Sequence, residues 1–192
     1  MMVAIKTVKK KICLLGDAAV GKTSLIKRFV YDEFDDKYVS TLGAKVSKKD
    51  MHLNISNNGH EPMDVNLTLS IWDILGQKNE SAMRTRPIYF NGTNGAFIIC
   101  DVTRKETFKN LTEWIYSLLH ETRRVPIVII GNKIDRTQDT EVPYKDLAKF
   151  AKDHNIPMFT TSAKTNDNVD KAFNKLSELM LKESMSDDNG SK

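Results

Sequence analysis

The chain has few of the residues that mark disulfide-rich or membrane-spanning proteins. Its 192 residues include only two cysteines and five prolines, and the net charge of +4 is small for a nucleic-acid-binding domain. No apolar run approaches the roughly 20 residues that a membrane helix needs; the longest are 96–100 and 125–130. These shortages argue against a disulfide scaffold and a helical membrane protein, and we expect no nucleic-acid partner.

Both cysteines, Cys13 and Cys100, lie in apolar runs typical of buried strands, so we expect free thiols and a reducing compartment. The first three residues show no signal-peptide or myristoylation pattern, and the last seven contain no cysteine for prenylation. We therefore expect a soluble, cytoplasmic monomer with no direct lipid anchor. The composition, 40% hydrophobic and 28% charged, suits one globular domain, which we place at 1–182, followed by a disordered tail at 183–192.

What the chain does contain is a phosphate-binding loop. Residues 16–23 read G-D-A-A-V-G-K-T and match the pattern G-x-x-x-x-G-K-[ST]. An apolar run at 12–15, typical of a buried parallel strand, precedes the loop, and helical apolar spacing at 24–30 follows it. The glycines let backbone N–H groups turn inward toward phosphate oxygens. Lys22 supplies a charge for the outer phosphates, and the Thr23 hydroxyl suits the Mg²⁺ that accompanies a nucleoside triphosphate.

The next segment, 31–42, is polar and reads as an exposed functional loop. Two strands are predicted at 43–55 and 64–72, and the second alternates cleanly between apolar and polar residues. The turn residues at 56–59 join the two strands as an antiparallel hairpin.

An acidic residue and a glycine follow the second of these strands. Asp73, at the carboxyl end of the strand, stands where a Mg²⁺-associated carboxylate is expected. Gly76 can bring a backbone N–H to the terminal phosphate, and the Gln77 amide can hold a water molecule with both its donor and its acceptor.

Strands and helices then alternate along the chain. The predicted strands are 95–101, 127–131 and 158–161, and the predicted helices are 107–121, 144–153 and 169–182. Such alternation predicts an α/β fold: a three-layer, mainly parallel six-stranded sheet with helices on both faces, one antiparallel edge strand, and ligands at the carboxyl edge.

Two further motifs fall at that edge. Asn132-Lys133-Ile134-Asp135 follows one predicted strand and Thr161-Ser162-Ala163-Lys164 follows another. The Asp135 carboxylate can accept hydrogen bonds from guanine N1–H and the 2-amino group, a pair that adenine lacks. A site built on such bonds discriminates by roughly 10⁴. The Ala163 backbone N–H can donate to guanine O6.

With these motifs in order, residues 11–182 resemble a small GTPase of the Ras superfamily, and the sequence is most similar in character to the Rab and Rho branches. The resemblance depends on G-D-A-A-V-G-K-T at Gly16, Y-V-S-T-L-G at Tyr38, W-D-I-L-G-Q at Trp72, C-D-V-T at Cys100, G-N-K-I-D at Gly131 and T-S-A-K at Thr161.

The resemblance implies a role for each matching residue. The loop that binds the phosphates comprises Gly16, Asp17, Ala18, Ala19, Val20, Gly21, Lys22, Thr23 and Ser24. The base and the nucleotide are enclosed by Phe34, Tyr38, Asn132, Lys133, Asp135, Ser162, Ala163 and Lys164. Mg²⁺ is ligated by Thr23 and Thr41, with Asp73 reaching it through water. Hydrolysis of GTP involves Gln77, which positions the attacking water, with Lys22, Thr41 and the γ-phosphate sensor Gly76.

The resemblance also implies partners. The segments 32–42 and 74–88 are expected to be switches that change with the nucleotide and contact effectors, a GTPase-activating protein and an exchange factor. Arg84 and Arg86 lie in the second of these segments, where a surface role is favoured over a catalytic one.

Several positions depart from the family pattern. Leu75 stands where alanine is usual, Lys78 where glutamate is common, and Ala18 and Ala19 replace a more glycine-rich pair. The hairpin region is longer than usual, with an extra loop expected at 57–62. The absence of a prenylation cysteine fits prokaryotic relatives of the family.

Two alternatives therefore stay open. A nucleotide-dependent scaffold that binds GTP or GDP with little hydrolysis is suggested by Leu75, Lys78 and Ala18. An ATP-using enzyme with a phosphate-binding loop is disfavoured by Asp135.

Overall fold

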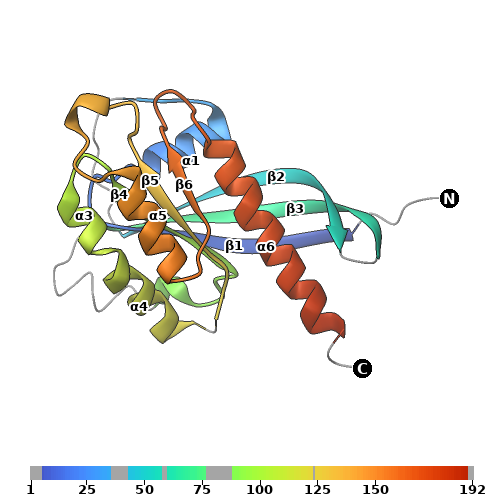
Figure 1. Ribbon diagram of the computed structural model, residues 1–192. Coiled ribbons are helices and arrows are strands. Elements are labelled where there is room, and N and C mark those ends of the chain that lie inside the picture. The colour runs from blue at the N-terminus through green and yellow to red at the C-terminus, as the bar shows by residue number, and fades with distance from the viewer. Residues whose placement is uncertain (1–5, 36–42, 58–59, 77–87, 123, 190–192) are drawn as a thin grey trace.

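The computed structural model describes residues 6–35, 43–57, 60–76, 88–122 and 124–189. It contains a six-stranded sheet in the order β2-β3-β1-β4-β5-β6 (Figure 1). The strands are β1 Lys6–Leu15, β2 Ala44–Asn57, β3 His60–Ile74, β4 Gly95–Asp101, β5 Ile127–Asn132 and β6 Met158–Thr161. The helices are α1 Lys22–Tyr31, α3 Lys105–Lys109, α4 Leu111–Glu121, the 3₁₀ turn η1 Thr137–Asp139, α5 Tyr144–Asp153 and α6 Val169–Asn189.

Only β2 runs antiparallel, and it occupies the edge of the sheet beside β3. The other neighbouring strands pair in parallel. In the centre, every residue of β4 and β5 is buried, as expected for strands that helices cover on both faces. The predicted fold class is confirmed.

Helices cover the two faces of the sheet as separate layers (Figure 1). α1 and α6 pack on one face, where the rings of Phe29 and Phe173 stack at 3.8 Å and Phe97 from β4 meets Phe173 edge-on at 4.8 Å. α4 and α5 pack on the other face, with Trp114 and Leu147 among the buried residues. The buried side of β3 follows the predicted alternation, with Val65, Leu67, Leu69 and Ile71 in the core shared with α1 and α6.

The helix predicted at 107–121 is interrupted. α3 ends at Lys109 and α4 begins at Leu111, with Asn110 serving as the cap between them. The interruption lets the Asn110 amide reach Asp17 in the phosphate-binding loop, at 2.7 Å. The spacing of buried residues does not reveal such a break, because Thr107 before it and Leu111 and Trp114 after it are still three or four residues apart.

The extra length of the hairpin region enters the strands rather than a loop at 57–62. β2 continues to Asn57 and β3 starts at His60, with Asn57 opposite His60 and a register shift between Ile55 and Asn57. The predicted antiparallel pairing is confirmed, but Ser56 and Asn57, which were expected in the turn, belong to β2, and both strands are longer than expected.

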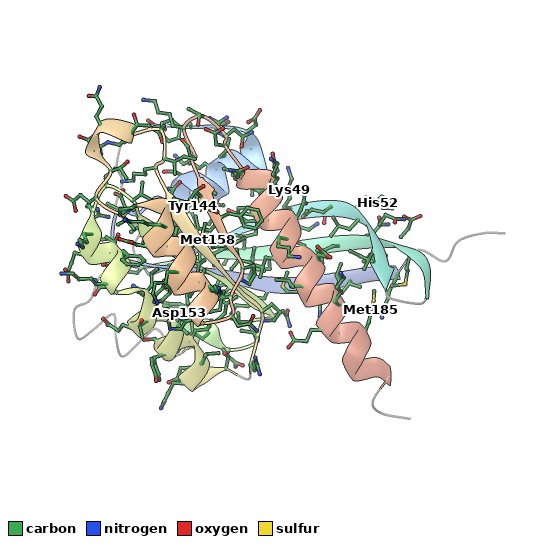
Figure 2. All side chains as sticks on the ribbon, in the orientation of Figure 1. Lys49, His52, Tyr144, Asp153, Met158 and Met185 are labelled. Atoms are coloured by element: carbon green, nitrogen blue, oxygen red, sulfur yellow. The ribbon has the colours of Figure 1, made fainter. Side chains whose placement is uncertain are left out.

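The C-terminal helix is also longer than expected. α6 continues to Asn189, where a disordered tail was expected from about Glu183. The Met185 side chain packs against the core beneath α1 and α6, and Figure 2 shows it on the C-terminal half of the helix. Ser184 Oγ donates to the Met180 carbonyl at 2.9 Å and accepts from Lys10 Nζ at 2.5 Å. The long strand β1 supplies this contact, so the helix has a surface to pack on beyond Lys182.

None of the helices within the described ranges combines the length and hydropathy that crossing a bilayer requires.

Candidate functional site

The phosphate-binding loop joins β1 to α1 in the predicted strand-loop-helix arrangement. Gly16 and Gly21 have φ of 145° and 102°, a region that disfavours side chains. A Cβ atom at Gly16 would lie 2.2 Å from the Ile99 carbonyl oxygen, and one at Gly21 would lie 2.2 Å from Asn132 Nδ2. Both positions therefore require glycine for two reasons, the backbone conformation and the close approach of a neighbour.

The Lys22 ammonium lies inside the loop. Its Nζ donates to the carbonyls of Gly16 and Asp17, both at 2.8 Å, and the residue is buried. A cation held by main-chain oxygens at this point is positioned for the charge of a phosphate group.

The Asp17 side chain ties the loop to the opposite helical layer. Its two carboxylate oxygens accept hydrogen bonds from Asn110 Nδ2 at 2.7 Å and from the Trp114 indole N–H at 2.8 Å. Sequence reasoning missed Asn110 and Trp114. The only available signal was general: a buried indole N–H needs an acceptor.

Two of the predicted magnesium ligands meet at the ends of α1 and β3. The Thr23 hydroxyl donates to Asp73 Oδ2, and Asp73 is buried. Oxygen atoms of this kind fit Mg²⁺, which uses one or two protein ligands together with water and substrate phosphates. Within the described ranges no cluster of three or more His, Cys, Asp or Glu side chains is arranged to hold a metal.

Gly76 lies directly against the phosphate-binding loop. A Cβ atom there would lie 2.5 Å from the Asp17 carbonyl and from Lys22 Nζ. The preceding Leu75 N–H donates to the Gly43 carbonyl at 3.0 Å, which ties this segment to the start of β2. The predicted γ-phosphate sensor is thus next to the loop.

Asn132, the first residue of the N-K-x-D motif and the last of β5, links the phosphate-binding loop to β6. Its Nδ2 donates to the Val20 carbonyl at 2.9 Å, and its Oδ1 accepts from the Thr161 hydroxyl at 3.0 Å. The side chain is buried, so its amide acts as an internal tie between the phosphate-binding loop and β6.

Asp135 and Ser162 bring the two predicted guanine motifs together. Ser162 Oγ donates to Asp135 Oδ1 at 2.6 Å and accepts from the Thr165 N–H at 3.1 Å. The neighbouring Ala163 is buried, and its carbonyl accepts from Arg28 Nε at 2.9 Å. The Asp135 carboxylate is therefore held in one orientation at the carboxyl edge of the sheet.

The network around Asp101, a residue of the C-D-V-T motif, was not predicted. The carboxylate is 1% exposed and accepts from Lys133 Nζ at 2.7 Å and Arg104 Nε at 3.0 Å. Thr103 donates its N–H at 3.0 Å and its hydroxyl at 2.7 Å. Arg104 also donates to the Ala18 carbonyl at 2.8 Å.

The Asp101 network keeps its carboxylate ionised. Burial by itself raises the pKa of Asp101, but the hydrogen bonds from Lys133 and Thr103 outweigh burial, so the pKa lies below its usual value. A hollow of about 670 Å³ opens beside the network, bordered by Ala19, Arg104 and Lys133 among others.

The remaining predicted site residues stand as follows. Phe34 is half-buried and packs against the core beneath α1 and α6, and Ser24 is half-buried in the first turn of α1. Lys164 is exposed, with its carbonyl accepting from Arg28 at 3.2 Å. Tyr38, Thr41 and Gln77, and also Lys78, Arg84 and Arg86, lie outside the described residues.

Comparison with known proteins agrees with the motifs. The family model described as "Ras family" matches residues 11–182. The chain is 33% identical over 174 residues to "Ras-related protein Rab-13" of Mesocricetus auratus, an alignment that covers 90% of this chain and 80% of that protein. It is 33% identical over 180 residues to "GTP-binding protein ypt5" of Schizosaccharomyces pombe, covering 92% and 80%. It is 36% identical over 176 residues to "Ras-related protein Rab-21" of Geodia cydonium, covering 91% and 72%.

The ordered motifs, the six-stranded sheet with one antiparallel edge strand, and these matches agree with one another. The chain belongs to the Ras family.

Proposed function

We propose that this protein binds GTP or GDP together with Mg²⁺ and hydrolyses GTP slowly, acting as a molecular switch. One observation carries the proposal: side-chain hydrogen bonds at one edge of the sheet join the carboxyl ends of β3, β5 and β6 and the segments that follow β1, β5 and β6. Thr23 bonds Asp73, Asn132 bonds the Val20 carbonyl and Thr161, and Ser162 bonds Asp135. Ligands of parallel α/β sheets bind at this edge.

Selection of guanine is proposed for Asp135. The hydrogen bond from Ser162 orients the half-buried Asp135 carboxylate, so the carboxylate oxygens can accept from the two adjacent N–H donors that guanine offers. Asparagine at this position would place an amide N–H against one of those donors. We expect Asp135→Asn to lose most of a preference for GTP over ATP that is roughly 10⁴ in the unaltered protein.

Competitive titration of both proteins with GTP and ATP measures that preference. Asp139→Asn is a matched control, because Asp139 is also an aspartate of the same loop but is exposed and paired with Arg136 at 2.8 Å. Equal affinity for the two nucleotides in the unaltered protein would favour the ATP-using alternative instead.

Phosphate and metal binding are proposed for the loop at 16–24. Its backbone N–H groups and Lys22 would hold the phosphates, and Thr23, Thr41 and Asp73 would hold Mg²⁺. When bound, the metal ion neutralises charge on the outer phosphates.

The switch is proposed to operate through Gly76. Because Gly76 already lies against Asp17 and Lys22, a third phosphate that enters beside Lys22 must displace or bond its backbone. Either outcome would change the conformation of the segment that follows Gly76. The segments 32–42 and 74–88 would then present nucleotide-dependent surfaces to effectors and regulators.

Hydrolysis is proposed to depend on Gln77, which would orient the attacking water. Single-turnover phosphate release from GTP should proceed at about 10⁻⁴ to 10⁻³ s⁻¹ without a partner, and Gln77→Leu should slow it at least about tenfold because the leucine side chain neither donates nor accepts a hydrogen bond. Gln138→Leu, an exposed glutamine on η1, is the control.

Absence of phosphate release from a protein that binds GTP would favour the scaffold alternative. A pull-down that compares protein loaded with GDP and with a nonhydrolysable GTP analogue then tests the switch. If no partner distinguishes the two forms, the switch proposal is wrong even where turnover is measurable.

A further inference from the structure

We infer that Asp101 is a positioning residue that acts through Arg104. It fixes the phosphate-binding loop relative to the loop of the N-K-x-D motif, at 132–135, and so slows nucleotide release. The inference rests on the proposed function, because it concerns how tightly the same site holds its nucleotide. It assigns a role to the C-D-V-T motif, which the proposed binding residues leave unused.

The Arg104 guanidinium contacts both Asp101 and the phosphate-binding loop. Arg104 Nε donates to Asp101 Oδ2 at 3.0 Å while the far nitrogen of the same guanidinium donates to the Ala18 carbonyl at 2.8 Å. A planar guanidinium can make two such bonds in fixed directions, whereas a lysine ammonium is a single point of charge. Arg104 is thus a rigid bridge from the end of β4 to the middle of the phosphate-binding loop.

Asp101 also pairs with Lys133 of the N-K-x-D motif. Lys133 Nζ lies 2.7 Å from Asp101 Oδ2, the same oxygen that Arg104 contacts. Lys133 has a positive φ of 72°, so its backbone adopts a conformation that costs energy for a residue with a side chain. Its pairing with a carboxylate that is 1% exposed helps to hold the residue in that conformation.

One buried carboxylate therefore orients two cations: Lys133, which belongs to the N-K-x-D loop, and Arg104, which bonds the phosphate-binding loop at the Ala18 carbonyl. Ala18 and Lys133 can separate only if a charge-assisted hydrogen bond breaks. Opening of the loops is what lets a bound nucleotide leave, so the network should act on the rate of release. It should not act on base selection, because Asp135 is held separately by Ser162.

The experiment measures release of a fluorescent GDP analogue from the full-length protein in Mg²⁺. Arg104→Ala should release it at least about tenfold faster, because it loses the bond to the Ala18 carbonyl as well as the bond to Asp101, and one hydrogen bond to a charged group alone is worth about that factor. Arg104→Lys should also release it faster, because lysine can keep the ion pair with Asp101 but cannot also reach the Ala18 carbonyl. Arg136→Ala is the control, since Arg136 is a nearby arginine whose side chain bonds Asp139 instead.

A double-mutant cycle separates positioning from general stabilisation. If Arg104 holds the loop only where Asp101 positions it, the double variant Asp101→Asn/Arg104→Ala should release nucleotide no faster than Asp101→Asn alone. Should Asp101→Asn fail to fold, the comparison of Arg104→Ala with Arg104→Lys still tests the bridge, because Arg104 is partly exposed at 42%. The ratio of GTP to ATP affinity should be unchanged in each Arg104 variant.

Three results would overturn the inference: unchanged release from Arg104→Ala, full recovery of slow release in Arg104→Lys, or release rates that merely follow the unfolding midpoints of the variants. In these cases the unaltered protein still binds GDP, so the proposed function stands. If the unaltered protein does not retain the GDP analogue, the proposed function fails and the inference fails with it.

Discussion

Single buried polar side chains hold the loops of this protein together. Asn132 is the clearest case, because its amide makes one hydrogen bond to the phosphate-binding loop and one to β6. We predict that Asn132→Ala lowers the free energy of unfolding by about 2 to 4 kcal/mol, since the Val20 carbonyl and the Thr161 hydroxyl each lose a buried partner.

Urea unfolding measures this change in the absence of nucleotide. Asn174→Ala on α6 is the matched control, because Asn174 is exposed and its replacement should change stability by less than about 0.5 kcal/mol. Similar losses in the two variants would contradict the structural role of Asn132.

Both cysteine thiols lie inside the folded protein, where burial affects their ionisation. Cys13 and Cys100 are free and buried, as expected from their apolar surroundings. Burial, and to a lesser extent the neighbouring Asp101 carboxylate, raises the pKa of Cys100 to about 12, and burial also raises the pKa of Cys13. We predict that neither thiol reacts with a disulfide reagent at pH 8 until the protein unfolds, because the thiolate is the reactive form.

The reagent should label both cysteines in denaturant, which serves as the control, whereas prompt labelling of the native protein would contradict the burial.

The raised pKa of Cys100 also makes the stability of the protein depend on pH. Unfolded Cys100 ionises near its ordinary pKa of 9.0 and the folded residue near 12, so the folded state binds more protons in between. Its contribution to stability is complete below pH 9 and is lost as the pH rises toward 12.

At the scale of elements, the length of helix α6 depends on the residues against which its last turns pack. Beyond Lys182 the helix is supported by Met185, which packs on the core, and by the bond between Lys10 and Ser184. We predict that truncation after Lys182 lowers the free energy of unfolding by about 1 to 2 kcal/mol, because the burial of part of a methionine side chain and one partly buried polar contact are lost.

Chemical denaturation of the truncated and full chains measures this loss, and truncation after Asn189 is the control because it removes nothing that α6 contains. Equal stability of the two truncated chains would show that the last turns of α6 contribute nothing.

Element types were predictable because hydrophobic periodicity is a local property. The bounds of β4, α5 and β6 fall where apolar runs and turn residues placed them. The break at Asn110 and the extension of α6 were not predictable, because each depends on a partner far along the chain: Asp17 for Asn110 and Lys10 for Ser184. Propensity sets the starting expectation, and tertiary contacts then decide the ends.

For the whole molecule, the proposed ligand should be a major source of stability. The candidate site joins loops from β1, β3, β5 and β6, so a nucleotide bound there would hold both sides of the sheet together. We predict that GDP with Mg²⁺, at 100 times its dissociation constant, stabilises the protein by about 2.7 kcal/mol and raises Tm by about 5 to 10 °C.

Differential scanning fluorimetry measures the shift. ATP with Mg²⁺ at the same concentration should leave Tm unchanged, and removal of Mg²⁺ with a chelator should reduce the effect of GDP. An equal shift with ATP would contradict selection of guanine, and no shift with either nucleotide would contradict binding.

The sequence by itself determined the family and the position of the binding motifs, because each motif is a short run of residues whose chemistry depends on its immediate neighbours. Loop, strand and helix order followed from the same local patterns. Only the tertiary structure decided which side chains join those motifs: Trp114 is 97 residues from Asp17, and Arg104 is 86 residues from Ala18. Such partners are chosen by the packing of the sheet and its two helical layers, and no local pattern in the chain encodes them.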